Sequence, residues 1–143
     1  MTVVNGLSSM VGSDKNGVRS AINAGLDRDV TVGLTLWSLV EADEDSLLVD
    51  YEVLDPPEKT ELHIVLVESE LVTEPQRGEN RGETLEHTNV VRSWVTLPDW
   101  AGVADVPIPS DAVREHCQLF AFVQHKRTME VLGATSLSPF SPE

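Results

Sequence analysis

Residues 47–57, Leu47-Leu48-Val49-Asp50-Tyr51-Glu52-Val53-Leu54-Asp55-Pro56-Pro57, alternate apolar and polar side chains with a period of two. Successive side chains of a β-strand point to opposite faces, so Leu47, Val49, Tyr51 and Val53 share one face. Asp50 and Glu52 lie on the other face, which is expected to contact water. Proline cannot donate a backbone hydrogen bond to a sheet, and the Pro-Pro pair therefore ends the segment. The stretch predicts a half-buried strand.

The same alternation continues on both sides of this strand. Turn signals recur every 8–14 residues, which is typical of an antiparallel β-sandwich. The sequence therefore predicts a mainly β, immunoglobulin-like sandwich of about seven strands, with the third buried on both faces for part of its length. The expected strands cover residues 30–40, 47–53, 62–67, 87–97, 103–108, 117–124 and 130–137.

The connections between the expected strands carry their own signals. An acidic turn is predicted at residues 41–45, and a single helical turn at 110–115 capped by Ser110 or Asp111. Gly133 is a candidate β-bulge in the last strand, because glycine within a strand often marks an extra residue. These features break the strands without interrupting the sandwich.

Residues 1–28 follow a different pattern. Asn5-Gly6 is a strong turn signal between two short β-prone segments, and Ser13 is the expected N-cap of a helix with Asp14 in its first turn. A hairpin and one short helix bury too little surface to fold alone. We therefore predict three parts: residues 1–28, a sandwich domain over 29–138, and a flexible tail over 139–143.

Composition excludes several classes of partner. The net charge of −14 repels nucleic-acid phosphate and anionic lipid. No apolar run approaches the roughly 18 residues that span a bilayer, so membrane insertion is not expected. The N-terminus shows neither the basic nor the apolar region of a signal peptide. We expect neither nucleic acid nor membrane insertion, while the oligomeric state stays open.

The single cysteine, Cys117, excludes an intramolecular disulfide, a Cys-x-x-Cys redox pair and a cysteine-based zinc site. It enters an apolar run next to His116, and neighbours on a strand point to opposite faces. A buried, inert thiol is the preferred interpretation. The four histidines are scattered without a metal-binding spacing, and no nucleophile or phosphate-binding motif occurs. We expect no catalytic residue, no cofactor and no metal, and hence no enzyme.

The polar segment 73–86 is longer than a hairpin requires, and such loops are often functional. Arginines within and after it can clamp a carboxylate or a phosphate, while its acids and histidine can bind a cation. The alternative is a loop held by its own Arg–Glu and Asn–backbone bonds. The candidate binding residues are Arg77, Glu79, Asn80, His87 and Arg92.

The aromatic residues leave two interpretations open. Trp37, Trp94 and Trp100, with Phe120 and Phe122, can form an exposed recognition patch. The alternative, which we prefer, is that they belong to the core of the sandwich.

The segment Arg77-Gly-Glu-Asn-Arg-Gly-Glu-Thr-Leu-Glu-His-Thr-Asn-Val-Val-Arg92 resembles the Gly-Glu-Asn-x-Gly…Leu-x-His-x-x-Val-Val-Arg signature of a family of uncharacterised bacterial secreted proteins, DUF1223. Residues 3–6, 11–14 and 130–134 are also similar to that family. The resemblance implies an extracytoplasmic location and a thioredoxin-like half upstream, whose last hairpin and helix would be residues 1–28. The redox Cys-x-x-Cys of that half is absent here, so its thiol–disulfide exchange does not carry over.

Three functional hypotheses follow. In the first, the chain is a non-catalytic accessory module that binds a partner or positions a domain, its partner being the thioredoxin-like domain of the same parent chain or another protein. In the second, it is a stand-alone small-anion or metal-binding protein that uses the 77–92 loop. In the third, it is part of a thiol–disulfide oxidoreductase whose active site lies outside this chain.

Overall fold

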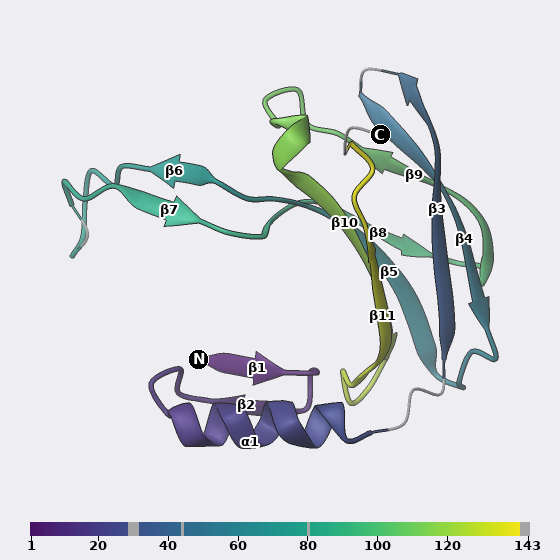
Figure 1. Ribbon diagram of the computed structural model, residues 1–143, viewed down its shortest axis with the longest axis horizontal. Coiled ribbons are helices and arrows are strands. Elements are labelled where there is room, and N and C mark those ends of the chain that lie inside the picture. Colours follow the sequence, from purple (N-terminus) through teal and green to yellow (C-terminus); the bar gives the residue numbers. More distant parts are fainter. Residues whose placement is uncertain (29–31, 44, 80, 141–143) are drawn as a thin grey trace.

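Two antiparallel sheets face each other and form a β-sandwich, as predicted from the alternation (Figure 1). The computed structural model describes residues 1–28, 32–43, 45–79 and 81–140. The two sheets contain seven strands in the described residues. One sheet has the order β3-β4-β9, from Gly33–Asp43, Ser46–Leu54 and Ala101–Pro107. The other has the order β11-β10-β5-β8, from Val131–Leu137, Cys117–His125, Thr60–Glu68 and Val90–Leu97.

The strand order is that of an immunoglobulin-like sandwich, except that one strand belongs to the opposite sheet. Of the seven strands in chain order, the first, second and fifth form the three-stranded sheet. In a constant-type immunoglobulin domain the fourth strand joins this sheet. Here the fourth strand, β8, pairs with β5 of the opposite sheet, placing Ile64 across from Val95. The four-stranded sheet is thereby widened by one strand.

The inward-facing side chains of both sheets form the core. Leu47 and Val49 of β4 are buried, as are Tyr51 and Val53, in agreement with the predicted alternation. The four-stranded sheet contributes inward side chains from its two central strands, which pair along their whole length. These are Leu62, Ile64, Leu66, Leu119, Ala121 and Val123, each fully buried. Val30, the first residue of the expected strand 30–40, lies outside the described residues.

Strand β5 is buried on both faces, as predicted. Val65 and Val67 are each 4% exposed although they do not belong to the core between the sheets. They alternate with the core residues and therefore lie on the outer face of the four-stranded sheet. The side chains on that face must cover them.

An N-terminal unit precedes the sandwich and consists of β1 (Thr2–Val4), β2 (Ser8–Met10) and helix α1 (Lys15–Leu26). The predicted hairpin and helix are confirmed, but the predicted N-cap is wrong by one residue. Asp14, rather than Ser13, is the N-cap, and its Oδ1 accepts a hydrogen bond of 3.0 Å from the Gly17 backbone N–H. The carboxylate thereby satisfies a free donor of the first helical turn.

Three contacts join the N-terminal unit to the turn between β10 and β11. The backbone N–H of Val131 donates to the Asn5 carbonyl at 2.8 Å, and Arg28 pairs with Glu130. Gly6 has φ +72°, and a Cβ there would lie 1.8 Å from the Met129 carbonyl oxygen. Only glycine permits both that conformation and that approach. The unit is therefore held against the sandwich at its hairpin turn and at the end of α1.

Further local predictions differ from the structure, at the segment 73–86, at the start of the strand expected over 87–97, at the acidic turn 41–45 and at the helical turn 110–115. The 73–86 segment begins and ends in a small ribbon of β6 (Leu71–Thr73) and β7 (Leu85–His87), and the chain breaks before β8. Asn89, with φ 53°, supplies this break. Strand β3 runs through the expected acidic turn to Asp43, which pairs with Ser46, since an edge strand tolerates charged residues.

The expected helical turn at 110–115 is instead a 3-10 turn at Arg114–His116 without a side-chain cap. Asp111, one of the two predicted caps, bonds Arg92 instead.

Two further local features concern the last strand. The β10–β11 register shifts between Val123 and Gln124, beside Gly133, where the bulge was predicted. The tail predicted over 139–143 is described up to Phe140, whose ring packs against the core, while residues 141–143 lie outside the described residues.

Candidate functional site

The candidate binding residues nominated from the sequence lie in different places. Arg77 and Glu79 are exposed in the loop that joins β6 to β7, at the far end of a ribbon that projects from the sandwich (Figure 1). His87 ends β7 and is half-buried. Arg92 lies within β8, at the sandwich itself. Asn80 lies outside the described residues. The structure therefore does not gather Arg77, Glu79 and Arg92 into one clamp.

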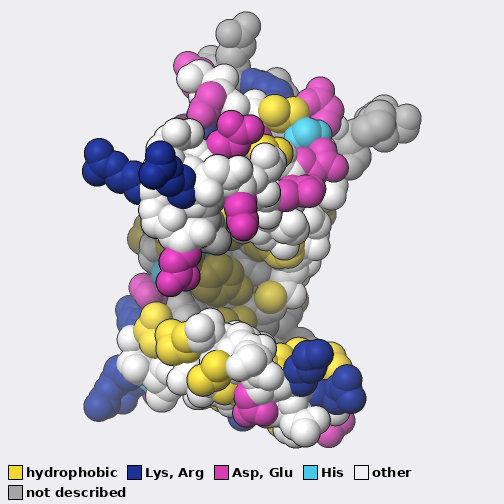
Figure 2. All heavy atoms as spheres, turned by 90° about the vertical axis from the view of Figure 1, so that its left-hand side faces the viewer, with side chains coloured by type: hydrophobic (Ala, Val, Ile, Leu, Met, Phe, Trp, Pro, Cys, Tyr) yellow, Lys and Arg dark blue, Asp and Glu magenta, His cyan; other side chains and the backbone are white. Residues whose placement is uncertain are grey.

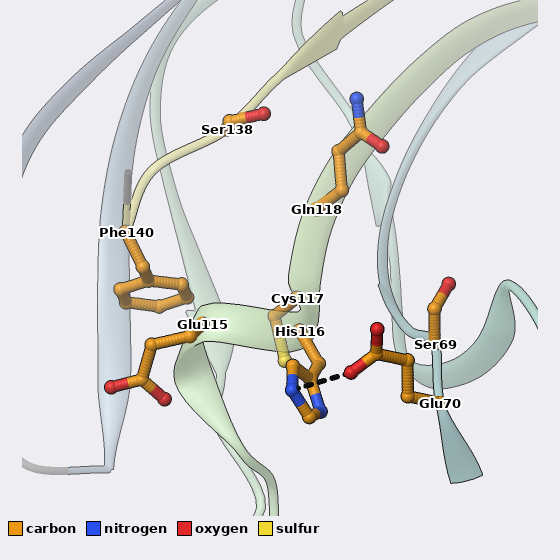
Figure 3. Close-up of a pocket in the computed structure, with 8 residues that line it drawn as sticks. All are labelled: Ser69, Glu70, Glu115, His116, Cys117, Gln118, Ser138 and Phe140. Atoms are coloured by element: carbon orange, nitrogen blue, oxygen red, sulfur yellow. Dashed lines mark ion pairs between the residues drawn. The ribbon is translucent and has the colours of Figure 1, made fainter. Parts of the chain in front are cut away.

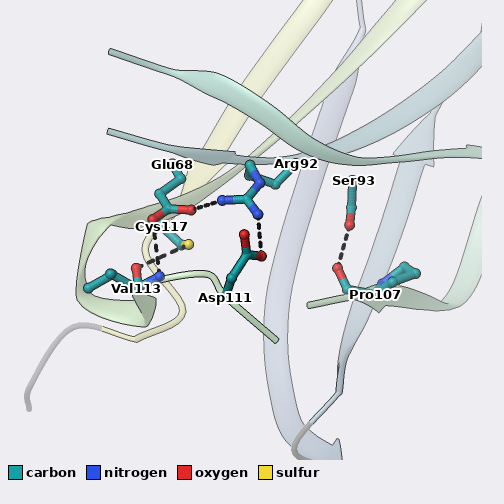
Figure 4. Close-up of polar contacts among 7 residues, drawn as sticks. All are labelled: Glu68, Arg92, Ser93, Pro107, Asp111, Val113 and Cys117. Atoms are coloured by element: carbon teal, nitrogen blue, oxygen red, sulfur yellow. Dashed lines mark hydrogen bonds and ion pairs between the residues drawn. The ribbon is translucent and has the colours of Figure 1, made fainter. Parts of the chain in front are cut away.

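Arg92 is engaged in a buried ion pair (Figure 4). Its guanidinium bonds Glu68, which is fully buried, and the Asp111 carboxylate at 2.5 Å. The second Glu68 oxygen accepts the Val113 backbone N–H at 3.0 Å. Burial acts to lower the pKa of Arg92, but the bonds and charges of Asp111 and Glu68 raise it overall. Arg92 stays charged and holds the segment before β10 against β5.

Cys117 lies beside this ion pair and is 7% exposed, which confirms the prediction of a buried thiol. Its Sγ donates to the Val113 carbonyl at 3.4 Å (Figure 4). Burial raises the pKa of the Cys117 thiol, and the Glu68 carboxylate adds to this effect, while Arg92 and Arg114 oppose it. A thiol that is buried and kept protonated is a poor nucleophile and a poor metal ligand.

A small pocket of about 270 Å³ opens next to Cys117 (Figure 3). His116 Nε2 lies 2.7 Å from Glu70 Oε2 on its wall, and the Ser69 hydroxyl donates to Asn89 Oδ1 at 3.3 Å. The pocket is lined by Ser69, Glu70, Glu115, His116, Cys117, Gln118, Ser138 and Phe140. Among the described residues, no three His, Cys, Asp or Glu side chains are grouped to hold a metal ion. Ser69 therefore bonds Asn89 while His116 bonds Glu70, so the serine and the histidine are not bonded to each other.

An aromatic cluster lies on the outer face of the four-stranded sheet. His63 of β5 packs between Trp94 of β8 and Phe122 of β10, with ring centroids 5.0 and 5.2 Å away. Trp94 meets Phe122 edge-on at 5.6 Å and 86°, a favoured arrangement. His63 Nδ1 accepts the Trp94 indole N–H at 3.2 Å and lies 2.8 Å from the Thr96 hydroxyl. With Nδ1 as the acceptor, the ring proton sits on Nε2.

The aromatic residues divide between the core and the outer faces of the two sheets, so they do not form one patch. Trp100 packs against the core, as preferred from the sequence. Trp94 and Trp37 are 53% and 46% exposed, on the outer faces of opposite sheets. Alternation could have shown that Trp94 and Val95 face opposite ways, but not which of them faces inward, because both are apolar.

A hollow fronts the aromatic cluster. The space-filling view shows it between two bulges of the surface, with hydrophobic side chains at its floor (Figure 2). The outer face of the four-stranded sheet forms this floor, and the N-terminal unit and the β6–β7 ribbon stand on either side of it (Figure 1). These elements together make a bracket-shaped surface with an apolar base.

The family of the chain is shown by its sequence. Residues 1–124 match the family described as Protein of unknown function (DUF1223). The chain belongs to this family. The match spans both the N-terminal unit and most of the sandwich, and it confirms the family resemblance seen at residues 77–92.

A solved structure is similar to part of this DUF1223 chain. The crystal structure of a domain of the outer membrane lipoprotein Omp28 from Porphyromonas gingivalis is similar at 14% identity, with a TM-score of 0.44. The alignment covers 76% of this chain and 87% of that one. No curated protein matches the sequence. Within the described part of the chain, no helix is long and apolar enough to cross a membrane.

The charged groups at Arg92 and the thiol of Cys117 are engaged in holding the sandwich together. Among the described residues, the apolar hollow and the N-terminal unit beside it also present accessible apolar side chains.

Proposed function

We propose that this DUF1223 chain is a non-catalytic accessory module of an extracytoplasmic protein, and that its sandwich positions a thioredoxin-like domain. The N-terminal unit, in this proposal, is the part of that domain which the sandwich holds. One observation carries the proposal: the unit is tied to the sandwich although none of the described residues Lys15–Leu26 of its helix is buried.

The N-terminal unit lacks a core of its own. Its exposed apolar side chains include Val11 at 68%, Leu26 at 76% and Ile22 at 45%. A two-stranded hairpin is marginally stable at best, and a helix of 12 residues is marginal in isolation. Such a unit gains stability when a further layer covers its apolar residues. This supports its assignment as one portion of a larger α/β domain.

The hairpin also offers an open edge. Among the described residues β1 pairs only with β2, so the other side of β1 has free backbone donors and acceptors. An unpaired strand edge is a template for another strand. In Figure 1, β1 lies on the side of β2 that faces the hollow. A strand added to β1 would therefore continue the sheet into the hollow, as the proposed domain requires.

The absence of catalysis from this chain is part of the proposal. The pocket beside Cys117 holds a His116–Glu70 pair, and the lone thiol is buried and protonated. Any thiol–disulfide exchange by the parent protein would then take place on the partner domain. The module would supply position and orientation, which rigid attachment through Asn5, Gly6 and Arg28 provides.

Two steps test the proposal. The first is to sequence the genomic reading frame upstream of Met1, where a thioredoxin-like half is expected. The second is to compare hydrogen exchange of the β1 amides in the present chain and in the longer product. Exchange is expected to slow by at least about tenfold in the longer product, because β1 gains a second neighbouring strand.

The amides of β4 serve as the control for this exchange experiment, since β4 is paired on both sides already and should not change. An upstream frame without such a half, or equal exchange of β1 in both products, contradicts the proposal.

A further inference from the structure

We infer that the outer face of the four-stranded sheet is the surface on which the body of the thioredoxin-like domain rests, with Trp94 as its main anchor. This inference rests on the proposed function and adds the second half of the interface. The N-terminal unit would contribute the strand edge, and the sandwich would contribute an apolar platform.

The platform is built by three neighbouring strands in register. Across them, Phe120, Val65 and Trp94 form one row, and Phe122, His63 and Thr96 form the next. An antiparallel sheet with one face in the core commonly presents polar side chains on the other. Here the first row is apolar throughout, and the second combines Phe122 with His63 and Thr96. Val65 and His63 are buried, whereas Trp94 is 53% exposed and presents its apolar ring to solvent.

Trp94 combines exposure with a fixed orientation. Its side chain is 53% exposed, yet its indole N–H is bonded to His63 and its ring abuts Phe122. His63 is itself 6% exposed and is held by Thr96. A rigid, accessible tryptophan loses little conformational entropy on binding, and tryptophan is enriched among the residues that dominate interfaces. The geometry thus prepares Trp94 to enter a partner's surface.

The position of the hollow identifies its occupant. The N-terminal unit bounds the hollow on one side, and β1 turns its open edge toward it (Figure 1). Any domain that extends the sheet from β1 must therefore occupy the hollow and meet its floor (Figure 2). The platform and the open edge form one continuous surface. A single partner, the domain to which the N-terminal unit belongs, covers both.

Hydroxyl-radical footprinting of the tryptophans tests this inference. The 143-residue chain and the longer product of its reading frame are compared. Oxidation of Trp94 is expected to fall by at least about fivefold in the longer product, because the ring is covered there. Trp37 is the matched control, because it is 46% exposed on the outer face of the opposite sheet. Its oxidation should stay the same.

The variants Trp94→Ala and Trp37→Ala in the longer product provide the second measurement. Removal of the anchor should speed hydrogen exchange of β1 by about tenfold, whereas Trp37→Ala should leave it unchanged. Exchange of the β5 amides reports whether each variant keeps the sandwich fold. Should Trp94→Ala unfold the sandwich, the footprint of the unsubstituted proteins still decides.

The outcomes separate the inference from the proposed function. If β1 is protected in the longer product while Trp94 stays as reactive as Trp37, the platform inference is overturned and the proposed function survives. If neither β1 nor Trp94 is protected, both fail. If Trp94 is protected in the short chain in a concentration-dependent way, the occupant is a second copy, and the inference is again overturned.

Discussion

The two sheets of the sandwich differ in how the side chains of their outer faces are packed. The outer face of the four-stranded sheet carries His63, Phe122 and Trp94 over the buried Val65. The outer face of the three-stranded sheet mixes carboxylates with exposed apolar side chains. Glu52 and Asp105 are exposed and Asp50 is half-buried, while Val103 and Leu54 are 55% and 57% exposed. On it Trp37 lies across from Asp50.

The core of the sandwich does not impose this difference. Both sheets bury the same kind of aliphatic side chain inward, which suffices for a sandwich. The contacting cluster of His63, Phe122 and Trp94 lies on one sheet alone and is not part of the core.

The largest effect is expected where the four-stranded sheet buries charge. Arg92→Ala leaves the carboxylate of Glu68 buried with only the Val113 N–H as partner, and should lower the free energy of unfolding by about 3–5 kcal/mol. Arg77→Ala, the same change in the exposed loop, should stay within about 0.5 kcal/mol. Urea denaturation measures both. Equal values would mean that Arg92 is not a structural support.

A smaller effect distinguishes the aromatic residues of the two outer faces. Phe122→Ala removes the ring that contacts both His63 and Trp94, and should cost about 2 kcal/mol of unfolding free energy. Trp37→Ala on the opposite face should cost less than about 1 kcal/mol, because its side chain is 46% exposed. Thermal unfolding of both variants measures the difference. A larger loss for Trp37→Ala would reverse the assignment of which face is packed.

The sequence predicted the strands well because alternation is a local property. The sandwich class, the doubly buried β5 and the buried Cys117 all followed from neighbouring residues. The pairing of Arg92 with Glu68 and Asp111 did not, because those residues are 24 and 19 positions away and meet only in the folded sheet.

Two further features escaped sequence analysis for related physical reasons. The outward position of Trp94 was hidden because its inward neighbour Val95 is equally apolar. Asp14 replaced Ser13 as N-cap because both residue types suit that position, and a shift of one residue is decided by which side chain reaches the N–H of Gly17. In both cases the local pattern was compatible with two arrangements, and tertiary contacts or a single bond selected one.

The smallest expected effect concerns the ionisation of one buried side chain in each sheet, a thiol in one and a phenol in the other. Burial raises the pKa of Cys117 in the four-stranded sheet and that of Tyr51 in the three-stranded sheet, with Glu68 and Asp99 adding to the respective shifts. A raised folded-state pKa means that stability is complete below the unfolded-state pKa and declines as pH rises through the folded one. The decline should begin near pH 8.5 for the thiol and near pH 10 for the phenol, as an order-of-magnitude estimate from free side chains.

Cys117→Ala should therefore remove the first part of the alkaline loss and Tyr51→Phe the second, as measured by urea midpoints from neutral to strongly alkaline pH. Alkylation by iodoacetamide at mildly alkaline pH gives an independent check, with Cys117 of the folded chain expected to react at least about tenfold more slowly than in urea. Rapid alkylation of the folded chain would show that the Val113 contact opens readily and that the thiol is available for chemistry. Slow alkylation would leave the hollow, rather than the cysteine, as the feature of this sheet that meets a partner.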